Sequence, residues 1–193
     1  MVETPSEMLP LGTPMPSFSL KDAVTGKVVT DRDAAGKKAT LVMFICNHCP
    51  FVKHVVDELG RIAGDYIPKG GAVVAVNSND VSSYPEDGPG NMKKLAASKG
   101  WRFPFLFDDT QDVAKTFKAA CTPDFFLFDA DGKLAYRGQL DDSGPGNNIP
   151  VTGKDLRSAL DAVLSGKPAV AVQKPSIGCN IKWKPGNEPP YFG

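Results

Sequence analysis

A short apolar segment that runs directly into an amphipathic helix pattern is the feature that most restricts how this chain can fold. Residues 38–45, KATLVMFI, are apolar and rich in β-formers, as a buried strand requires. After Pro50 the apolar positions follow helical spacing instead: Val52, Val55, Val56, Leu59 and Ile62. Proline suits the first turn of a helix, where its missing N–H is not needed. The pattern therefore predicts a strand–helix unit with Cys46 and Cys49 at its junction.

Similar patterns along the rest of the chain indicate an α/β fold. They predict a second buried strand at 71–79, a helix at 91–100, a short strand at 103–107 and a helix at 110–120. Residues 124–140 are predicted to form a hairpin around Asp131-Gly132, and 153–166 an amphipathic helix. We expect a mixed sheet whose first strands are parallel and whose last two form an antiparallel edge. The tail at 167–193 has too little periodicity to predict an element.

Length and charge exclude several classes of protein. With 193 residues, 41% of them hydrophobic, the chain can bury one substantial core, and no composition break indicates a second domain. The 22 basic and 22 acidic residues cancel without a basic run, so no nucleic-acid partner is expected. Residues 1–16 lack the basic and apolar regions of a signal peptide, and no segment has the apolar length to cross a bilayer. We therefore expect a soluble, cytoplasmic protein with no membrane partner.

The four cysteines are too few for a disulfide scaffold in a chain of this size. In a reducing compartment a close pair such as Cys46 and Cys49 is more often catalytic or metal-binding than structural. A zinc site usually needs four ligands. The other candidate ligands stand at irregular spacings: Cys121, Cys179, His48 and His54. The sequence therefore favours a redox pair, and no metal is expected.

A CxxC at a strand-to-helix junction, followed well downstream by CTPDFFLFD at 121–129, resembles a thioredoxin fold. Residues 11–27 resemble the opening hairpin of the peroxiredoxin and alkyl hydroperoxide reductase branch, and 129–142 resemble its closing strands. The chain is therefore similar to the peroxiredoxin-like group that has a thioredoxin-type CxxC, over roughly residues 10–165.

This resemblance implies a thioredoxin-like fold with a central mixed β-sheet flanked by helices, an N-terminal β-hairpin and an inserted helix-strand unit. We divide the chain into an N-terminal extension at 1–10, a thioredoxin-like redoxin domain at 11–166 and a C-terminal tail at 167–193. The tail lies outside the general family pattern and is expected to pack on the domain.

The same resemblance implies that Cys46 is the exposed nucleophile, that Cys49 is the buried resolving cysteine, and that a cis Thr122-Pro123 bond faces the pair. Only a thiolate attacks a disulfide, and a helix N-terminus is expected to stabilise Cys46 as an anion. His48 can add positive charge near that thiolate, which would make the couple more oxidising. The electrons reside in the cysteines, so no bound cofactor is expected.

Five polar residues are predicted to rim the cleft beside the cysteines, because ligands bind beyond the carboxyl ends of parallel strands. They are Asn77, Asn79, Asp80, Asp141 and Asp142. For each of them a solvated, turn-forming role is an equal alternative.

Two further cysteines are candidates for additional redox roles. Cys121 lies two residues before Pro123, and Cys179 lies in a tail that could fold back over the site. The alternatives are a small buried hydrophobe for Cys121 and a passive surface cysteine for Cys179.

The predicted function is thiol-disulfide exchange by Cys46 and Cys49, in a groove shaped by Thr122 and Pro123 that receives an extended substrate through backbone contacts. The expected partners are a protein or small-molecule disulfide and an electron donor of the thioredoxin or glutathione type.

Two other functions stay open. Peroxiredoxins have a threonine three residues before their reactive cysteine and an arginine ahead of the last hairpin, positions held here by Cys46 and Pro123. Both departures favour exchange, but a peroxidase with antioxidant activity, in which Cys49 attacks peroxide and Cys46 resolves it, is the first alternative. A noncatalytic thioredoxin-like binding module is the second.

Overall fold

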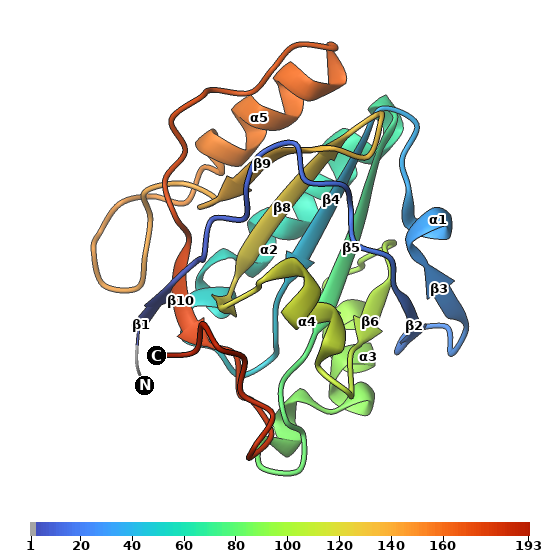
Figure 1. Cartoon of the computed structure of the whole chain (residues 1–193), viewed down its shortest axis with the longest axis vertical. Helices are drawn as coiled ribbons and strands as arrows, with labels where there is room; N and C mark the ends of the chain where they lie inside the picture. The colour runs from blue at the N-terminus through green and yellow to red at the C-terminus, as the bar shows by residue number, and fades with distance from the viewer. Residues whose placement is uncertain (1–2) are drawn as a thin grey trace.

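The computed structural model describes residues 3–193 and contains two β-sheets, with helices packed around the larger one (Figure 1). The larger sheet has seven strands in the order β3-β2-β6-β5-β4-β8-β9. Its strands are β2 (Ser19–Asp22), β3 (Val28–Thr30), β4 (Ala39–Phe44), β5 (Gly71–Asn77), β6 (Phe105–Phe107), β8 (Asp124–Asp129) and β9 (Leu134–Gly138). The helices are α1 (Asp31–Ala34), α2 (Pro50–Tyr66), α3 (Pro89–Ser98), α4 (Asp112–Phe117) and α5 (Lys154–Leu164), with 3₁₀ turns at Ile67–Lys69 and Pro85–Asp87.

The strand pairing confirms the predicted mixed sheet. β4 pairs in parallel with β5, and β5 pairs in parallel with β6. On the other side of β4, β8 and β9 form the predicted antiparallel edge. All six residues of β4 are buried, as expected for a central strand covered on both faces. The β2–β3 hairpin and the inserted α3–β6 unit complete the α/β architecture that the resemblance implied.

Side chains of β4 alternate between two apolar clusters on opposite faces of the sheet. Leu41 and Met43 pack in the cluster that includes the apolar faces of α2 and α5, whereas Val42 and Phe44 pack in the cluster around Phe117 of α4. α2 and α4 accordingly lie on opposite sides of β4 (Figure 1). Within residues 3–193, no helix combines the length and apolarity needed to span a bilayer.

The β8–β9 hairpin turns at the predicted Asp131-Gly132 pair. Gly132 has a φ of 72°, in the left-handed region that glycine adopts without steric cost. The Asp129 side chain accepts hydrogen bonds from the backbone N–H groups of Asp131 and Lys133. The turn is therefore closed by its own residues, which is why its sequence signal is strong.

The C-terminal tail contains a strand that the sequence did not predict. β10 (Ile177–Asn180) pairs antiparallel with β1 (Glu3–Pro5) on one side and with β7 (Cys121–Thr122) on the other. The two ends of the chain therefore meet in a three-stranded sheet beside the larger one (Figure 1). The prediction was wrong because β10 is four residues long and is stabilised by its neighbours rather than by a periodic apolar face. Residues 1–2 of the predicted extension lie outside the described range.

Gly178 allows β10 to approach β7 closely. A Cβ atom at this position would lie 2.0 Å from the carbonyl oxygen of Thr122 and 3.2 Å from the backbone nitrogen of Pro123. A side chain of any size would collide with these backbone atoms, so the observed strand pairing requires glycine at 178.

Replacing Gly178 by alanine should displace β10 from β7. The added methyl group meets backbone rather than a flexible side chain, so we expect the free energy of unfolding to fall by about 1–3 kcal/mol. Urea unfolding followed by tryptophan fluorescence measures this change. Gly90→Ala is the matched control, because a Cβ at Gly90 meets nothing within 4 Å. Equal stability of Gly178→Ala and the unmodified protein would show that β10 is not seated against β7.

Candidate redox site

The two cysteines of the CxxC lie where β4 ends and α2 begins, at the carboxyl end of the parallel strands. Cys46 is two residues beyond β4, and Cys49 directly precedes Pro50, the first residue of α2. Each thiol shifts the pKa of the other, and the Cys49 sulfur lies 3.2 Å from the Thr122 carbonyl oxygen. The Thr122-Pro123 bond is cis, as the resemblance implied, and the Thr122 hydroxyl lies 3.5 Å from the Cys46 sulfur. The residues expected around the pair are therefore brought together.

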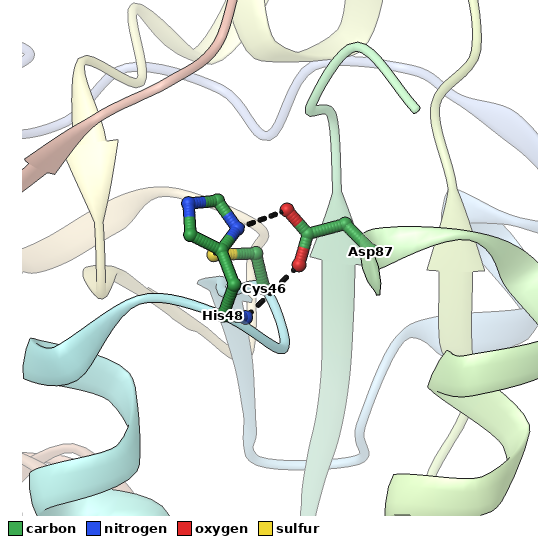
Figure 2. A group of neighbouring side chains, drawn as sticks. All are labelled: Cys46, His48 and Asp87. Atoms are coloured by element: carbon green, nitrogen blue, oxygen red, sulfur yellow. Dashed lines mark hydrogen bonds and ion pairs between the residues drawn. The ribbon is translucent and has the colours of Figure 1, made fainter. Parts of the chain in front are cut away.

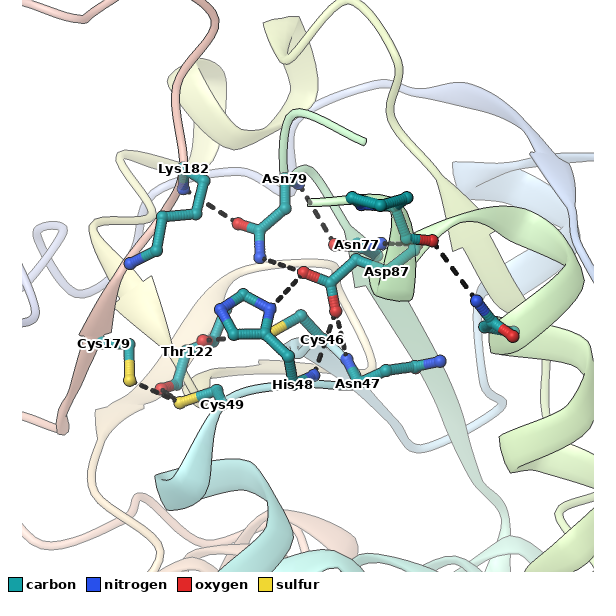
Figure 3. A network of polar contacts seen from close by, with 12 residues as sticks. Cys46, Asn47, His48, Cys49, Asn77, Asn79, Asp87, Thr122, Cys179 and Lys182 are labelled. Atoms are coloured by element: carbon teal, nitrogen blue, oxygen red, sulfur yellow. Dashed lines mark hydrogen bonds and ion pairs between the residues drawn. The ribbon is translucent and has the colours of Figure 1, made fainter. Parts of the chain in front are cut away.

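Neither cysteine is accessible, which corrects the expectation of an exposed Cys46. Both side chains have 0% relative solvent exposure. Figure 3 shows Thr122 and His48 beside the pair, with Cys179 of the tail next to Cys49. The site is closed in this conformation because the tail covers an edge that the sequence predicted to be open.

The predicted groove for an extended substrate is occupied by the chain itself. β10 pairs with β7, with Cys179 opposite Thr122 and Asn180 opposite Cys121. The backbone groups that a substrate would need at Thr122 are therefore used by the tail. Backbone contacts of a substrate at this edge stay a prediction, and in this structure β10 takes their place.

The helix N-terminus favours ionisation of Cys49 rather than Cys46. α2 begins at Pro50, so Cys49 is its N-cap residue; the Cys49 side chain makes no capping hydrogen bond, and the nearby Val52 N–H is only a minor cause of the lowered pKa of this thiol. The pKa of Cys49 is lowered to about 4, chiefly because the Cys46 S–H donates to it. The same bond, together with burial and the charge of Asp87, raises the pKa of Cys46. That Cys46 is the thiolate stays a prediction, and the lowered pKa of Cys49 argues against it.

A buried carboxylate holds the segment between the cysteines (Figure 2). Asp87 is fully buried, and its Oδ1 accepts hydrogen bonds from the backbone N–H groups of Asn47 at 2.8 Å and His48 at 3.0 Å. Its Oδ2 lies 2.5 Å from His48 Nδ1. Because the carboxylate oxygens are acceptors, the Nδ1 proton of His48 points at Asp87. Asp87 therefore fixes both the backbone and the imidazole of the CxxC.

His48 lies beside Cys46, with its Nδ1 3.9 Å from the sulfur. The ring stacks on Tyr84, with centroids 5.2 Å apart and planes at 11°. The negative charge of Asp87 behind the ring acts against ionisation of Cys46 and contributes to the raised pKa of that thiol. That His48 makes the Cys46–Cys49 couple more oxidising stays a prediction. The effect of the Asp87 charge on Cys46 has to be considered together with that of His48.

Asn77, Asn79 and Asp80 do not rim a cleft, which corrects that prediction. All three are buried. The Asn77 side-chain amide donates to the backbone carbonyl of Asp87 at 2.7 Å, and the Asn79 amide donates to Asp87 Oδ2 at 2.9 Å. The Asp80 carboxylate accepts from Ser82 and Ser83 and closes its own turn. The two asparagines therefore support Asp87, because the loop after β5 folds inward onto the CxxC.

Asp141 and Asp142 line a cavity of about 250 Å³ that is also bordered by Pro123. Asp141 accepts hydrogen bonds from the backbone N–H groups of Thr152 and Gly153, at 2.7 and 2.6 Å. Asp142 pairs instead with two lysines, Lys154 and Lys174. These carboxylates hold the loop before α5, and a substrate-binding role for them stays a prediction.

A third cysteine lies against the pair. Cys179 of β10, only 2% exposed, places its sulfur 2.8 Å from that of Cys49 (Figure 3). Burial and the hydrogen bond to Cys49 raise the pKa of Cys179 to about 12. Cys121 directs its sulfur at the Pro123 carbonyl oxygen, 3.6 Å away, and burial raises the pKa of its thiol. No disulfide links the four cysteines in the part of the chain that the structure describes.

Cys46, His48 and Asp87 each offer one potential metal ligand, and these atoms lie within 4.8 Å of one another. A metal there would need the Asp87 oxygens, which already accept four N–H hydrogen bonds from Asn47, His48 and Asn79. Structural zinc sites also take four ligands. These three side chains are better explained as part of a hydrogen-bond network than as a metal centre. The expectation of no metal stays a prediction.

The sequence reasoning missed Asp87, Tyr84 and Lys182. The Lys182 ammonium lies 5.8 Å from the centre of the Tyr84 ring, so the tail extends over the aromatic side chain that stacks on His48. For Asp87 and Tyr84 the one available signal was their position in the chain. Residues 77–90 follow β5, so this loop starts at the sheet edge that holds the cysteines. That loop contains three acidic residues, Asp80, Glu86 and Asp87, and nothing in the sequence distinguishes Asp87 from the others.

Comparison with known families identifies the chain at this point. Residues 10–156 match the Redoxin family. The chain belongs to this family. One similar structure is the crystal structure of an uncharacterized conserved protein from Geobacillus kaustophilus. The two sequences are 59% identical, the match covers 96% of this redoxin and 98% of that protein, and the TM-score is 0.95. A hypothetical protein from Sinorhizobium meliloti 1021 is 49% identical over 95% of this chain and 100% of its own, with a TM-score of 0.92.

More distant structures share the fold of this redoxin. A proposed thiol:disulfide interchange protein DsbE from Chlorobium tepidum is 23% identical, with a TM-score of 0.64 over 81% of this chain and 99% of its own. This likeness shows a thioredoxin-like fold alone. Functionally curated proteins gave no match. Membership of the Redoxin family supports an oxidoreductase at a coarse level.

The reduced protein should contain one thiolate at neutral pH, on Cys49. The ultraviolet absorbance of this thiolate should disappear as the pH falls through about 4, because the folded-state pKa of Cys49 lies well below that of an ordinary thiol. Spectrophotometric titration measures this transition. Cys49→Ser should abolish it, and Cys121→Ser should keep it. A transition that survives in Cys49→Ser and is lost in Cys46→Ser would assign the thiolate to Cys46 instead.

Proposed function

We propose that this redoxin is a thiol-disulfide oxidoreductase whose redox couple is Cys46 and Cys49. The observation that supports the proposal most directly is that both cysteines lie at the N-terminus of α2 against the same residue, with the Cys46 sulfur 3.5 Å from the Thr122 hydroxyl and the Cys49 sulfur 3.2 Å from the Thr122 carbonyl oxygen. Thiols held in contact react with one another in an effectively unimolecular step. No bound cofactor is needed, since the two electrons are those of the cysteine pair.

In the proposed exchange, the proton of Cys46 moves along the hydrogen bond to Cys49, and the Cys46 thiolate attacks a substrate disulfide. A mixed disulfide forms, and the expelled substrate thiolate takes the proton from Cys49. The Cys49 thiolate then attacks the Cys46 sulfur and releases the second substrate thiolate. Two cysteines are oxidised to one disulfide while one substrate disulfide is reduced. A donor dithiol or glutathione reverses the change in the protein.

Burial of the pair supports a small disulfide rather than a protein as the substrate. Both sulfurs have 0% exposure, and the β7 edge where an extended chain could pair is taken by β10. A protein substrate would have to displace the tail, including the close contact of Gly178 with Thr122. A low-molecular-weight disulfide needs no strand pairing at the β7 edge.

A redox titration in glutathione buffers tests the couple. We use Cys179→Ser, so that the sulfur beside Cys49 cannot take part, and expect a reversible two-electron couple confined to Cys46 and Cys49. Alkylation followed by mass spectrometry assigns each cysteine, and the midpoint gives the direction of electron flow. Adding Cys121→Ser to this variant is the control and should leave the couple unchanged. If both cysteines stay alkylatable in oxidising buffer, the proposed function fails.

Reduction of hydroperoxides is a second candidate, favoured by the lowered pKa of Cys49 at the start of α2. A hydroperoxide is small enough to reach a buried thiolate. Attack by Cys49 on the peroxide oxygen would form a sulfenic acid and release an alcohol or water. The Cys46 thiol would then displace water from Cys49 and form the same Cys46–Cys49 disulfide. The chain has Pro123 where the resemblance places the peroxide-binding arginine, which makes exchange the better supported function.

Single substitutions separate the two functions. If exchange is the main activity, Cys46→Ser should abolish turnover of a small disulfide such as oxidised glutathione, while hydroperoxide consumption stays low in every variant. If the protein is a peroxidase, Cys49→Ser should abolish hydroperoxide consumption, whereas Cys46→Ser should still undergo the first oxidation at Cys49. Single-turnover assays with a sulfenic-acid probe measure both. Rapid hydroperoxide turnover by the unmodified protein would favour the peroxidase.

A further inference from the structure

β10 brings a third sulfur into the redox site. We propose that Cys179 accepts the disulfide from the Cys46–Cys49 pair, forming a Cys49–Cys179 disulfide and returning Cys46 to the thiol state. The proposal rests on the proposed function, in which the Cys46–Cys49 disulfide forms first. It gives the C-terminal tail a part in the reaction, as the internal acceptor of the disulfide.

The sulfur positions favour this transfer. The Cys179 and Cys49 sulfurs are 2.8 Å apart, although 130 residues separate them in the sequence. Both sulfurs lie at the first turn of α2, where the nearby Val52 N–H lowers the pKa of Cys49 and the nearby Phe51 N–H lowers that of Cys179. These are N–H groups that a helix leaves without partners in its own first turn. The helix N-terminus therefore stabilises negative charge on either sulfur during exchange.

Cys179 is held in place by contacts on both sides of it in β10. Before it, Gly178 lies against the Thr122 carbonyl, and the Ser176 hydroxyl donates to the Pro123 carbonyl at 2.6 Å. After it, the backbone N–H of Ile181 donates to the Ala120 carbonyl at 3.0 Å. The close approach of the two sulfurs is therefore set by strand pairing, and a sulfur held in this way reacts at high effective concentration.

The chemistry of the transfer balances without an added oxidant. The Cys179 thiolate attacks the Cys49 sulfur of the Cys46–Cys49 disulfide, so that the Cys49–Cys179 bond forms and the Cys46–Cys49 bond breaks. Cys46 leaves as a thiolate and takes up the proton that Cys179 released. One cause of the raised pKa of Cys179 is its hydrogen bond to anionic Cys49. That cause is absent once Cys49 is part of a disulfide, so Cys179 ionises more easily at the moment it has to attack.

The product ties the tail to the helix that begins the site. In the Cys49–Cys179 form, β10 is covalently joined to the N-cap of α2, and the Cys46 thiol is left beside Thr122 and His48. The tail would then stay over the β7 edge until a donor reduces the bond. Oxidation would in this way keep the site closed to large partners.

Cys46→Ser isolates the proposed bond, because Cys49 and Cys179 are then the two cysteines whose sulfurs are in contact. The variant is equilibrated with oxidised glutathione, alkylated, and mapped as non-reduced peptides by mass spectrometry. We expect Cys49 to be linked to Cys179 rather than to glutathione. Adding Cys121→Ser should leave this link unchanged, whereas adding Cys179→Ser should replace it by a Cys49–glutathione mixed disulfide.

The unmodified protein gives a second test that does not depend on the folding of a variant. Its peptide map should contain both links of Cys49, in a ratio independent of protein concentration, because exchange occurs within one chain. Cys49 linked only to Cys46, together with a glutathione adduct on Cys49 in Cys46→Ser, would overturn the transfer and leave the proposed exchange function intact. Failure of Cys179→Ser to form the Cys46–Cys49 link would instead contradict the proposed function, and the transfer with it.

Discussion

The buried carboxylate of Asp87 is the interaction on which the rest of the site depends. Burial of a carboxylate without partners costs several kcal/mol, roughly, and here four N–H donors from Asn47, His48 and Asn79 compensate for it. The donors come from two different segments, the β4–α2 connection and the loop after β5. One side chain therefore anchors the backbone between the two cysteines and joins it to the neighbouring strand.

The same network continues into the C-terminal tail. The backbone N–H of Lys182, two residues beyond β10, donates to Asn79 Oδ1, and the Asn79 amide donates to Asp87. Asp87 in turn accepts from the backbone of His48, so three successive hydrogen bonds connect the tail to the CxxC (Figure 3). The pairing of β10 with β7 and the contact between Cys179 and Cys49 make the tail part of the site rather than an appendage. A site closed by its own chain discriminates by size, which connects the burial of the sulfurs with the proposal of a small substrate.

Local patterns were sufficient for the elements whose signals come from neighbouring residues. The apolar spacing of α2, with Pro50 at its first position, and the Asp131-Gly132 turn each act within a few residues, and the structure confirms both. β10 could not be predicted in this way, because it is stabilised by β1 and β7, which are far from it in sequence. Asp87 was missed for a similar reason. An acidic residue in a polar loop shows its role only when the groups that donate to it are known.

The sequence by itself determined that a CxxC lies between a buried strand and a helix in an α/β fold, because apolar periodicity and a helix-starting proline act over short distances along the chain. Only the tertiary structure decided how the pKa values of the two thiols are shifted and what covers the pair. The lowered pKa of Cys49 depends on its contacts with Cys46 and Cys179, and Cys179 reaches it across 130 residues of sequence. Hydrogen bonds and charges act through distance in space, and that distance is set when β10 pairs with β7.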